Sequence, residues 1–260
     1  MSFTVVKYEA SEGIATITIN RPDKLNALNK SVMTELEQAF DTATADSAVG
    51  AIIITGEGPK SFVAGADIAE LNVQTPLSAK DHSQFGQQIL FKLERSGKPV
   101  IAAINGFALG GGCELAMACH IRYASDNAKL GQPEVSLGII AGDMGTQRLP
   151  RLVGKGIALE ILLAGDLVPA QRAYEIGLVN KVVLQAELLN ECRKLAKTIM
   201  SKGPLAVKYT IEAVNEGLEM ELEDGGFYES TLFGLIAASE DMKEGTGAFL
   251  EKRKAEFKNK

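Results

Sequence analysis

Residues 99–149 constrain the fold of this 260-residue chain more than any other stretch. The segment starts with an apolar run at 100–104 that favours a strand, and the chain turns at Asn105-Gly106. Three consecutive glycines, 110–112, then directly precede an apolar run, 113–118, that favours a helix. A helix start leaves backbone N–H groups free and favours negative charge. The segment therefore predicts a strand, a turn and a helix whose start stabilises an anion.

Two carboxylates accompany this turn. Glu114 lies in the first turn of the predicted helix, and Glu134 follows in Gly131-Gln132-Pro133-Glu134. Two carboxyl groups that face one pocket can divide the roles of acid and base, because burial and mutual repulsion separate their pKa values. The alternative is that both are solvated surface charges of an acidic chain. The position of Glu114, between glycines and an apolar helix, favours the catalytic interpretation.

Small residues form two similar turns after strand-like runs, at 64–67 and at 109–112. Such residues let a ligand approach the backbone, and converging N–H groups can form an oxyanion hole. Tight packing of a strand against a helix would explain the same composition. The glycines match neither a phosphate-binding loop nor a dinucleotide-binding motif, which disfavours a nicotinamide enzyme.

Composition narrows the class of protein. The net charge of −6 disfavours non-specific nucleic-acid binding, and no apolar run approaches the length of a membrane span. Cys113, Cys119 and Cys192 lack the spacing of metal ligands, and His82 and His120 are too few for most histidine-centred metal sites. The N-terminus does not resemble a secretory signal. We expect a cytoplasmic protein without a metal, with buried structural thiols.

The order of predicted elements indicates an α/β fold. Repeated strand–strand–helix units occupy most of the chain, and only helices follow residue 200, which indicates an α/β core with an α-helical C-terminal region. Periodicity predicts helices that include residues 82–93, 218–238 and 241–257.

The chain resembles the crotonase family, the enoyl-CoA hydratase/isomerase superfamily, over nearly its full length. Six ordered blocks carry the resemblance: Asn20-Arg21-Pro22-x-Lys24-x-Asn26-Ala27-Leu28, Phe62-x-Ala64-Gly65-Ala66-Asp67-Ile68, Gly106-x-Ala108-x-Gly110-Gly111-Gly112-Cys113-Glu114-Leu115-Ala116, Gly131-Gln132-Pro133-Glu134, Gly145-Thr146-Gln147-Arg148-Leu149 and Phe249-Leu250-Glu251-Lys252-Arg253. The resemblance implies a crotonase-like spiral of ββα repeats in residues 1–199, which carries the acyl-CoA site. It also implies that the helical residues 200–260 serve oligomerisation, as a homotrimer or homohexamer.

The resemblance also implies roles for individual residues. The N–H groups of Ala66 and Gly111 would hold the thioester oxygen, Glu114 would activate water, and Glu134 would protonate Cα. Further residues are implied to bind the CoA part of the substrate: Lys24, Leu25, Ala27, Ala64, Ile68, Gly142, Phe249 and Lys252. Phe249 and Lys252 would close over its adenosine end, from the same subunit or from a neighbouring one.

One loop departs from the family pattern. The hydratases read Pro-Gly-x-Gly-Gly-Thr-Gln-Arg where this chain has Ala141-Gly142-Asp143-Met144-Gly145-Thr146-Gln147-Arg148. Since this loop borders the acyl pocket in the family, two hypotheses follow. Met144 narrows the pocket in favour of short acyl chains, or Asp143 contacts a polar acyl group or alters the acid/base pair. The alternative is that both side chains turn away.

The retained glutamate pair favours an enoyl-CoA hydratase that needs no cofactor, with coenzyme A as part of its substrate. Another crotonase reaction, such as isomerisation or decarboxylation, would use the same oxyanion hole. A binding scaffold, including one for RNA, is the alternative outside enzymes.

Overall fold

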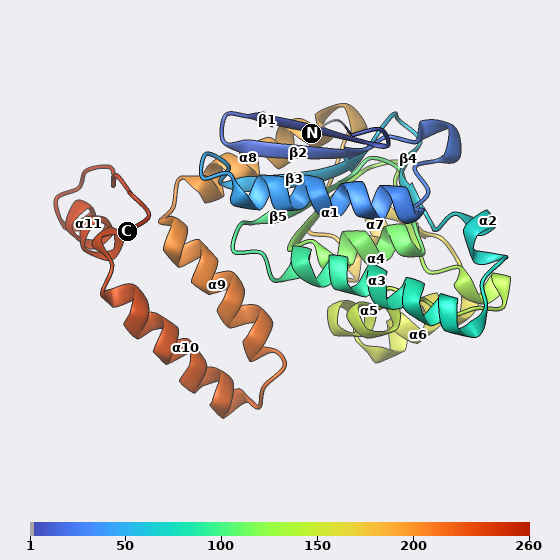
Figure 1. The fold of residues 1–260 in the computed structure, drawn as a ribbon. Helices are drawn as coiled ribbons and strands as arrows, with labels where there is room; N and C mark the ends of the chain where they lie inside the picture. The colour runs from blue at the N-terminus through green and yellow to red at the C-terminus, as the bar shows by residue number, and fades with distance from the viewer. Residues whose placement is uncertain (1–2) are drawn as a thin grey trace.

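The computed structural model describes residues 3–260 (Figure 1). In this part of the chain the strands are β1 (Val6–Ser11), β2 (Ile14–Ile19), β3 (Ala51–Gly56), β4 (Ser61–Ala64), β5 (Val100–Ile104), β6 (Phe107–Leu109), β7 (Ile121–Ser125), β8 (Lys129–Gly131), β9 (Val168–Pro169) and β10 (Lys181–Val183). The α-helices are α1 (Lys30–Ala45), α2 (Ile68–Leu71), α3 (Pro76–Glu94), α4 (Gly111–Ala118), α5 (Gly145–Val153), α6 (Lys155–Ala164), α7 (Ala170–Glu175), α8 (Leu188–Met200), α9 (Pro204–Gly217), α10 (Leu222–Ala237) and α11 (Glu240–Leu250). Short 3-10 helices are η1 (Pro22–Lys24), η2 (Glu134–Leu137) and η3 (Gln185–Glu187).

The strands form two sheets within residues 3–260. The larger has the order β1-β2-β3-β5-β7-β10, and the smaller has the order β4-β6-β8-β9. Neighbouring strands are parallel except in the pairs β1–β2 and β8–β9. Consecutive strands such as β3 and β4, or β5 and β6, go to different sheets, and a helix follows each pair. This arrangement is the predicted spiral of ββα repeats, so the predicted fold class is confirmed.

The central strands of the larger sheet are buried on both faces. Ile52 and Ile54 of β3 belong to a core cluster with the buried sides of α1, α3 and α4. Ile53 and Ile101 face the other way and pack with Leu188 of α8. Burial on both faces explains why these parallel strands read as continuous apolar runs rather than as alternating ones.

The smaller sheet sets the position of the candidate site. In its parallel register, Ala64 of β4 pairs with Leu109 of β6, and Leu109 pairs with Gly131 of β8. The three strands therefore end level with one another, at one edge of the sheet. Parallel α/β folds bind ligands at this carboxyl edge, and the two small-residue turns and Glu134 follow directly after it.

Helix boundaries differ from the sequence prediction in three places. Helix α3 begins at Pro76 rather than near residue 82, because Thr75 and Ser78 form a capping box and Pro76 occupies the first turn. Helix α10 begins at Leu222 rather than at 218. Helix α11 ends at Leu250 rather than at 257. The chain beyond it folds back, so that the Asp241 carboxylate accepts the N–H groups of residues 258 and 259 at 2.6 and 2.9 Å.

The C-terminal helices lie apart from the two sheets. Figure 1 shows α9 and α10 as an antiparallel pair that extends away from the rest of the molecule, with α11 beyond them. The helix α10 buries only Leu232, and α9 buries no residue. Within residues 3–260, no helix has the length and apolarity that a membrane crossing requires.

The approach of α4 to β4 predicts a large effect of one methyl group. A Cβ on buried Gly112 would overlap the carbonyl oxygen of Val63. Overpacking of this kind costs about 1–3 kcal/mol, so Gly112→Ala is expected to lower the free energy of unfolding by about that amount, measured in urea. The control is Gly156→Ala in α6, where the added Cβ meets no atom within 4 Å. Better helix propensity should stabilise that variant by about 0.5–1 kcal/mol. Equal stability of the two variants would contradict the described packing.

Candidate active site

Two backbone N–H groups lie near one another just beyond the ends of β4 and β6. Gly111 is the first residue of α4, so its N–H has no partner within the helix. The N–H of Ala66 donates no hydrogen bond to another group of residues 3–260. A Cβ built on Gly111 would lie 4.0 Å from the Ala66 nitrogen, which brings the two turns together. The two turns therefore bring the predicted donors near one another, and their role as an oxyanion hole stays a prediction.

The turn before Gly111 depends on its glycines. Gly110 has φ +50°, and Gly65 in the facing turn has φ +101°, both in the region that favours glycine. A Cβ on Gly110 would lie 3.1 Å from Oε1 of Glu134. Absence of side chains here thus lets the Glu134 carboxylate reach the start of α4.

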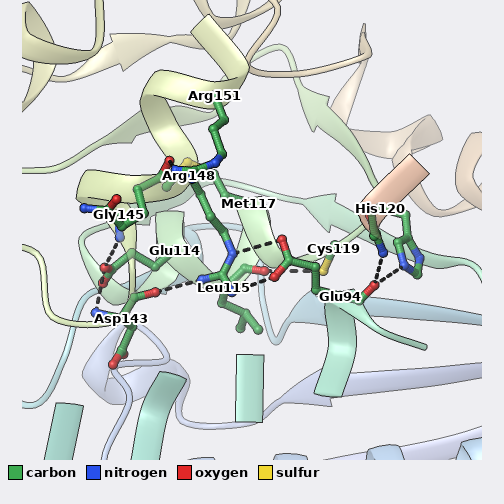
Figure 2. A network of polar contacts seen from close by, with 12 residues as sticks. Glu94, Glu114, Leu115, Met117, Cys119, His120, Asp143, Gly145, Arg148 and Arg151 are labelled. Atoms are coloured by element: carbon green, nitrogen blue, oxygen red, sulfur yellow. Dashed lines mark hydrogen bonds and ion pairs between the residues drawn. The ribbon is translucent and has the colours of Figure 1, made fainter. Parts of the chain in front are cut away.

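Glu114 is almost fully buried in the first turn of α4, with 2% of its surface exposed. Its Oε1 accepts the N–H groups of Asp143 and Gly145, at 2.8 and 2.7 Å (Figure 2). Burial, and next to it the negative charge of Asp143, raises the pKa of Glu114 to about 8. The two N–H groups oppose that shift, as hydrogen bonds to a carboxylate do. Glu114 is therefore a fixed carboxyl group that titrates near neutral pH.

An ion pair holds the loop that binds Glu114. Arg148 Nη1 donates to the carbonyl oxygen of Asp143 at 2.9 Å, and its Nη2 lies 2.9 Å from Oε2 of Glu94 at the end of α3. The Glu94 carbonyl in turn accepts a hydrogen bond from His120 (Figure 2) and another from Asn215 of α9. The network fixes the peptide groups of residues 143–145, and with them the orientation of Glu114.

Glu134 starts η2 just beyond the end of β8 and is partly exposed. Burial raises its pKa above the usual value for a glutamate. The buried amide of Gln132, with its nitrogen toward Glu134, donates to the two carboxylate oxygens at 2.7 and 3.1 Å. The charge of Glu134 also contributes to the raised pKa of Glu114. The negative charge of Asp143 contributes more to that shift than Glu134 does, and the division of acid and base roles between the two glutamates stays a prediction.

The loop of residues 141–145, which differs from the family pattern, directs one of its two unusual side chains toward the site. The position that a Cβ of Gly111 would take is 3.8 Å from Oδ2 of Asp143. Burial raises the pKa of Asp143 to about 6. The alternative that both side chains of this loop turn away from the site therefore does not hold for Asp143. Met144 has φ +77°, a left-handed conformation that a glycine would adopt without strain.

Several residues implied to bind CoA lie beside these turns. The N–H of Ala64 donates to the carbonyl of Leu25 at 3.0 Å, and Leu28 forms a parallel bridge with Ala66. Arg21 braces this contact through an ion pair with Asp67 of 3.0 Å. The other residues implied for this group are Lys24, which is exposed, Ala27, which is half-buried, and Ile68, which is exposed at the start of α2. Gly142 is held to α3 by Ser83 and Gln87.

Phe249 and Lys252 lie far from the other residues implied to bind CoA in the same chain. Both are exposed, at and just beyond the end of α11. Figure 1 places α11 at the opposite end of the molecule from α2. These two residues could reach the site only from a neighbouring subunit, which is how the resemblance allowed for them.

The remaining reactive side chains are structural. Cys113, Cys119 and Cys192 are buried, and burial raises the pKa of each thiol to about 12. The Nδ1 of His120 accepts the N–H of Val100 at 2.9 Å, so the opposite nitrogen carries the proton. Burial lowers the His120 pKa. These groups do not supply a nucleophile at neutral pH, in line with the sequence prediction of structural thiols.

Sequence reasoning did not assign roles to Gln132, Arg148 or Glu94. The first two lie within quoted motifs, and a polar residue in an otherwise apolar or glycine-rich block was the available signal. Glu94 had no such signal, because its importance comes from a contact with Arg148 across 54 positions.

Together, these groups suit reactions in which a carbonyl oxygen becomes negatively charged in the intermediate and a proton is transferred at a neighbouring carbon. Two N–H groups lie near two carboxyl groups whose pKa values are raised, at the carboxyl edge of a parallel sheet. Such a site can polarise a carbonyl group and move protons at the adjacent carbons.

Comparisons with known proteins agree with that class. Residues 9–260 match the sequence profile described as Enoyl-CoA hydratase/isomerase, and the chain belongs to this family. It is 50% identical over 260 residues to "Crotonyl-CoA hydratase" of Syntrophomonas wolfei, and 46% identical over 261 residues to "Short-chain-enoyl-CoA hydratase" of Clostridium acetobutylicum; both alignments cover 100% of each chain. The crystal structure of an enoyl-CoA hydratase from Bacillus anthracis superposes with a TM-score of 0.95 at 35% identity, covering 99% of this chain and 100% of the other.

Proposed function

We propose that this chain is an enoyl-CoA hydratase that adds water to the 2,3 double bond of a short trans-2-enoyl-CoA, giving 3-hydroxyacyl-CoA. The observation that carries the proposal is that Glu114 and Glu134, two carboxyl groups with raised pKa values, lie beside the neighbouring turns of Ala66 and Gly111. The short chain length is proposed from the names of the relatives, crotonyl-CoA hydratase and short-chain-enoyl-CoA hydratase.

The proposed reaction begins with the thioester oxygen bound by Ala66 and Gly111. Their N–H groups stabilise the enolate oxygen that forms when water adds to Cβ, a contribution of about 3–4 kcal/mol for one such donor. Glu114 takes a proton from the attacking water, and Glu134 gives a proton to Cα. Both carboxyl groups lie on one side of the double bond in this scheme, so addition is syn.

The pair must hold one proton for this chemistry. Since Glu114 is more deeply buried than Glu134, the shared proton of the resting pair favours Glu114. Dehydration starts from that form, because Glu114 then protonates the leaving hydroxyl group. Hydration uses the form with the proton on Glu134. Water supplies both the proton and the hydroxyl group, so we propose that no metal or redox cofactor takes part.

The remaining parts of the proposal concern the CoA group and the assembly. Lys24, Leu25, Ala27, Ala64, Ile68 and Gly142 contact CoA, and Phe249 and Lys252 reach it from a neighbouring subunit. Residues 1–199 form the catalytic core, and residues 200–260 form the oligomerisation region of a cytoplasmic homotrimer, alone or paired as a hexamer. Apolar side chains exposed on α9 and α10 and between them support this assembly, such as Leu218 at 77%, Leu222 at 93% and Phe233 at 72%.

Isomerisation is the alternative reaction at this site. It needs the same oxyanion hole but only one carboxyl group to move a proton along the chain. The presence of both glutamates favours hydration. The test is the loss of the enoyl-thioester ultraviolet absorbance on mixing the protein with crotonyl-CoA. Persistence of the absorbance, with no turnover at micromolar protein, would refute the proposed function.

The proposed mechanism predicts a pH dependence. Above about pH 8 the pair loses its last proton, because that is where Glu114 titrates, and no acid remains to protonate Cα. The kcat/KM for hydration is expected to fall about tenfold per pH unit in this range. Initial rates between pH 6 and 10 measure the profile, with circular dichroism to verify folding. A constant kcat/KM up to pH 10 would contradict a role for the shared proton.

A further inference from the structure

The main chain of Asp143 forms hydrogen bonds within the candidate site, but its carboxylate forms none. The N–H binds Glu114 and the carbonyl oxygen binds Arg148, so both peptide groups beside the side chain are fixed. Figure 2 shows the Asp143 carboxylate directed away from the carboxyl group of Glu114. The Asp143 side chain therefore starts from a backbone that is fixed on both sides.

That part lies between α3 and the start of α4. A Cβ on buried Gly86 of α3 would overlap the carboxylate of Asp143, so the missing side chain at position 86 makes the space that Asp143 fills. On the other side, Oδ2 lies 3.8 Å from where a Cβ of Gly111 would be. Asp143 thus closes the gap between the wall formed by α3 and the predicted oxyanion hole.

The carboxylate has no partner in the protein. Within residues 3–260, its oxygens accept no hydrogen bond and form no ion pair, and the nearby Arg148 is paired with Glu94. Burial raises the pKa of the Asp143 carboxyl group, and the charge of Arg148 acts in the opposite direction. A half-buried carboxylate without a partner reduces stability when it is ionised, and nothing in the packing of the loop requires a carboxylate at this position.

We propose that Asp143 is a specificity-determining residue that restricts the site to short acyl chains without negative charge. This inference rests on the proposed function, because it assumes that the acyl chain extends from the Glu114–Glu134 pair past this loop. A chain passing between Gly86 and Gly111 meets the Asp143 carboxylate. Its volume stops a long chain, and its charge repels an acyl group that ends in a carboxylate.

A second route past the loop makes the inference testable. An apolar cavity of about 460 Å³ reaches Glu134 and Ala141 from the other side, lined further by Ile140, Leu159 and Leu163. An acyl chain that entered this cavity would not meet Asp143. Substitutions at position 143 would then leave chain selection unchanged.

The experiment compares Asp143→Asn, which keeps the shape and removes the charge, with Asp143→Ala, which removes the volume. The control is Asp81→Asn, an exposed carboxylate on α3. The kcat/KM values are measured with trans-2-enoyl-CoA substrates of four, five and ten carbons, and with the five-carbon substrate that carries a terminal carboxylate. Affinities for the matching saturated acyl-CoA compounds, measured by calorimetry, report selection without turnover.

Asp143→Asn is expected to raise kcat/KM for the carboxylate-bearing five-carbon substrate, relative to kcat/KM for the neutral one, about tenfold or more. Asp143→Ala is expected to raise kcat/KM for the ten-carbon substrate, relative to kcat/KM for the four-carbon one, by about 10–100-fold. Both ratios should stay within twofold of the wild type in Asp81→Asn. Ratios unchanged in both Asp143 variants, in turnover and in affinity, would overturn the inference. Absence of turnover by the wild type, with selective affinities retained, would instead count against the proposed function.

Discussion

Replacement of Glu114 by glutamine is expected to lower kcat for crotonyl-CoA hydration by about 10³-fold. General acid–base catalysis contributes about 10²–10⁴-fold, and an amide at this position can neither take a proton from water nor return one. Folding should persist, because the amide oxygen can still accept the N–H groups of Asp143 and Gly145. The measurements are the initial rate at saturating substrate and the melting temperature.

Glutamate variants elsewhere serve as the comparison for this result. Glu134→Gln should lower kcat by a similar factor. Combining it with Glu114→Gln should lower kcat little further, since the two groups act as a unit. Glu160→Gln, on the exposed side of α6, should retain the wild-type rate. Full activity of Glu114→Gln would contradict the role that we assign to Glu114.

Removal of one backbone donor is expected to have the second large effect. Gly111→Pro deletes the N–H at the first position of α4, where proline fits the helix. Loss of one oxyanion donor costs about 10²–10³-fold in kcat, and the proline ring adds bulk where the thioester oxygen binds. We therefore expect kcat/KM to fall at least about 10²-fold, measured with crotonyl-CoA.

A second substitution at the same position separates the donor from the added volume. Gly111→Ala keeps the N–H and places a Cβ 3.3 Å from Cδ1 of Leu28, a contact that a small shift relieves. The kcat/KM of this variant should fall by about tenfold or less. Equal losses in the alanine and proline variants would show that space at Gly111, and not its N–H, limits the reaction.

The local parts of the site were predictable from sequence. The predicted strand and helix of residues 99–118 appear in the structure as β5 and α4, because an apolar run and glycines specify that order, whereas the short strand β6 between them was not predicted. Placement of Glu114 in the first turn of a buried helix followed from the same pattern. These features depend on neighbouring residues, which a sequence shows directly.

The contacts that assemble the site were less accessible. Nothing near Asp143 in the sequence indicates that its carboxylate fills the space above Gly86, 57 positions earlier. Likewise, Leu28 pairs with Ala66 through a single bridge between two loops. Such contacts arise from the order of strands in the smaller sheet, which sequence periodicity does not specify.

The helix ends show the same limit in the C-terminal region. Residues 251–257 are rich in charged residues compatible with a helix, yet Arg253 forms an ion pair with Glu244 and the tail returns to Asp241. Tertiary contacts override the local preference there. At the start of α3, a serine takes the place of the usual glutamate in the capping box, so the signal at Thr75 was easily missed.

The fate of solvent atoms tests the central claim most directly. The protein is incubated with crotonyl-CoA in water labelled with oxygen-18 and deuterium, and the acyl product is analysed by mass spectrometry and NMR. Addition of water by the Glu114–Glu134 pair predicts one oxygen-18 in the hydroxyl group at C3 and one deuterium at C2, with syn stereochemistry. Deuterium incorporation into a product that lacks the labelled hydroxyl group would contradict the account and would indicate an isomerase.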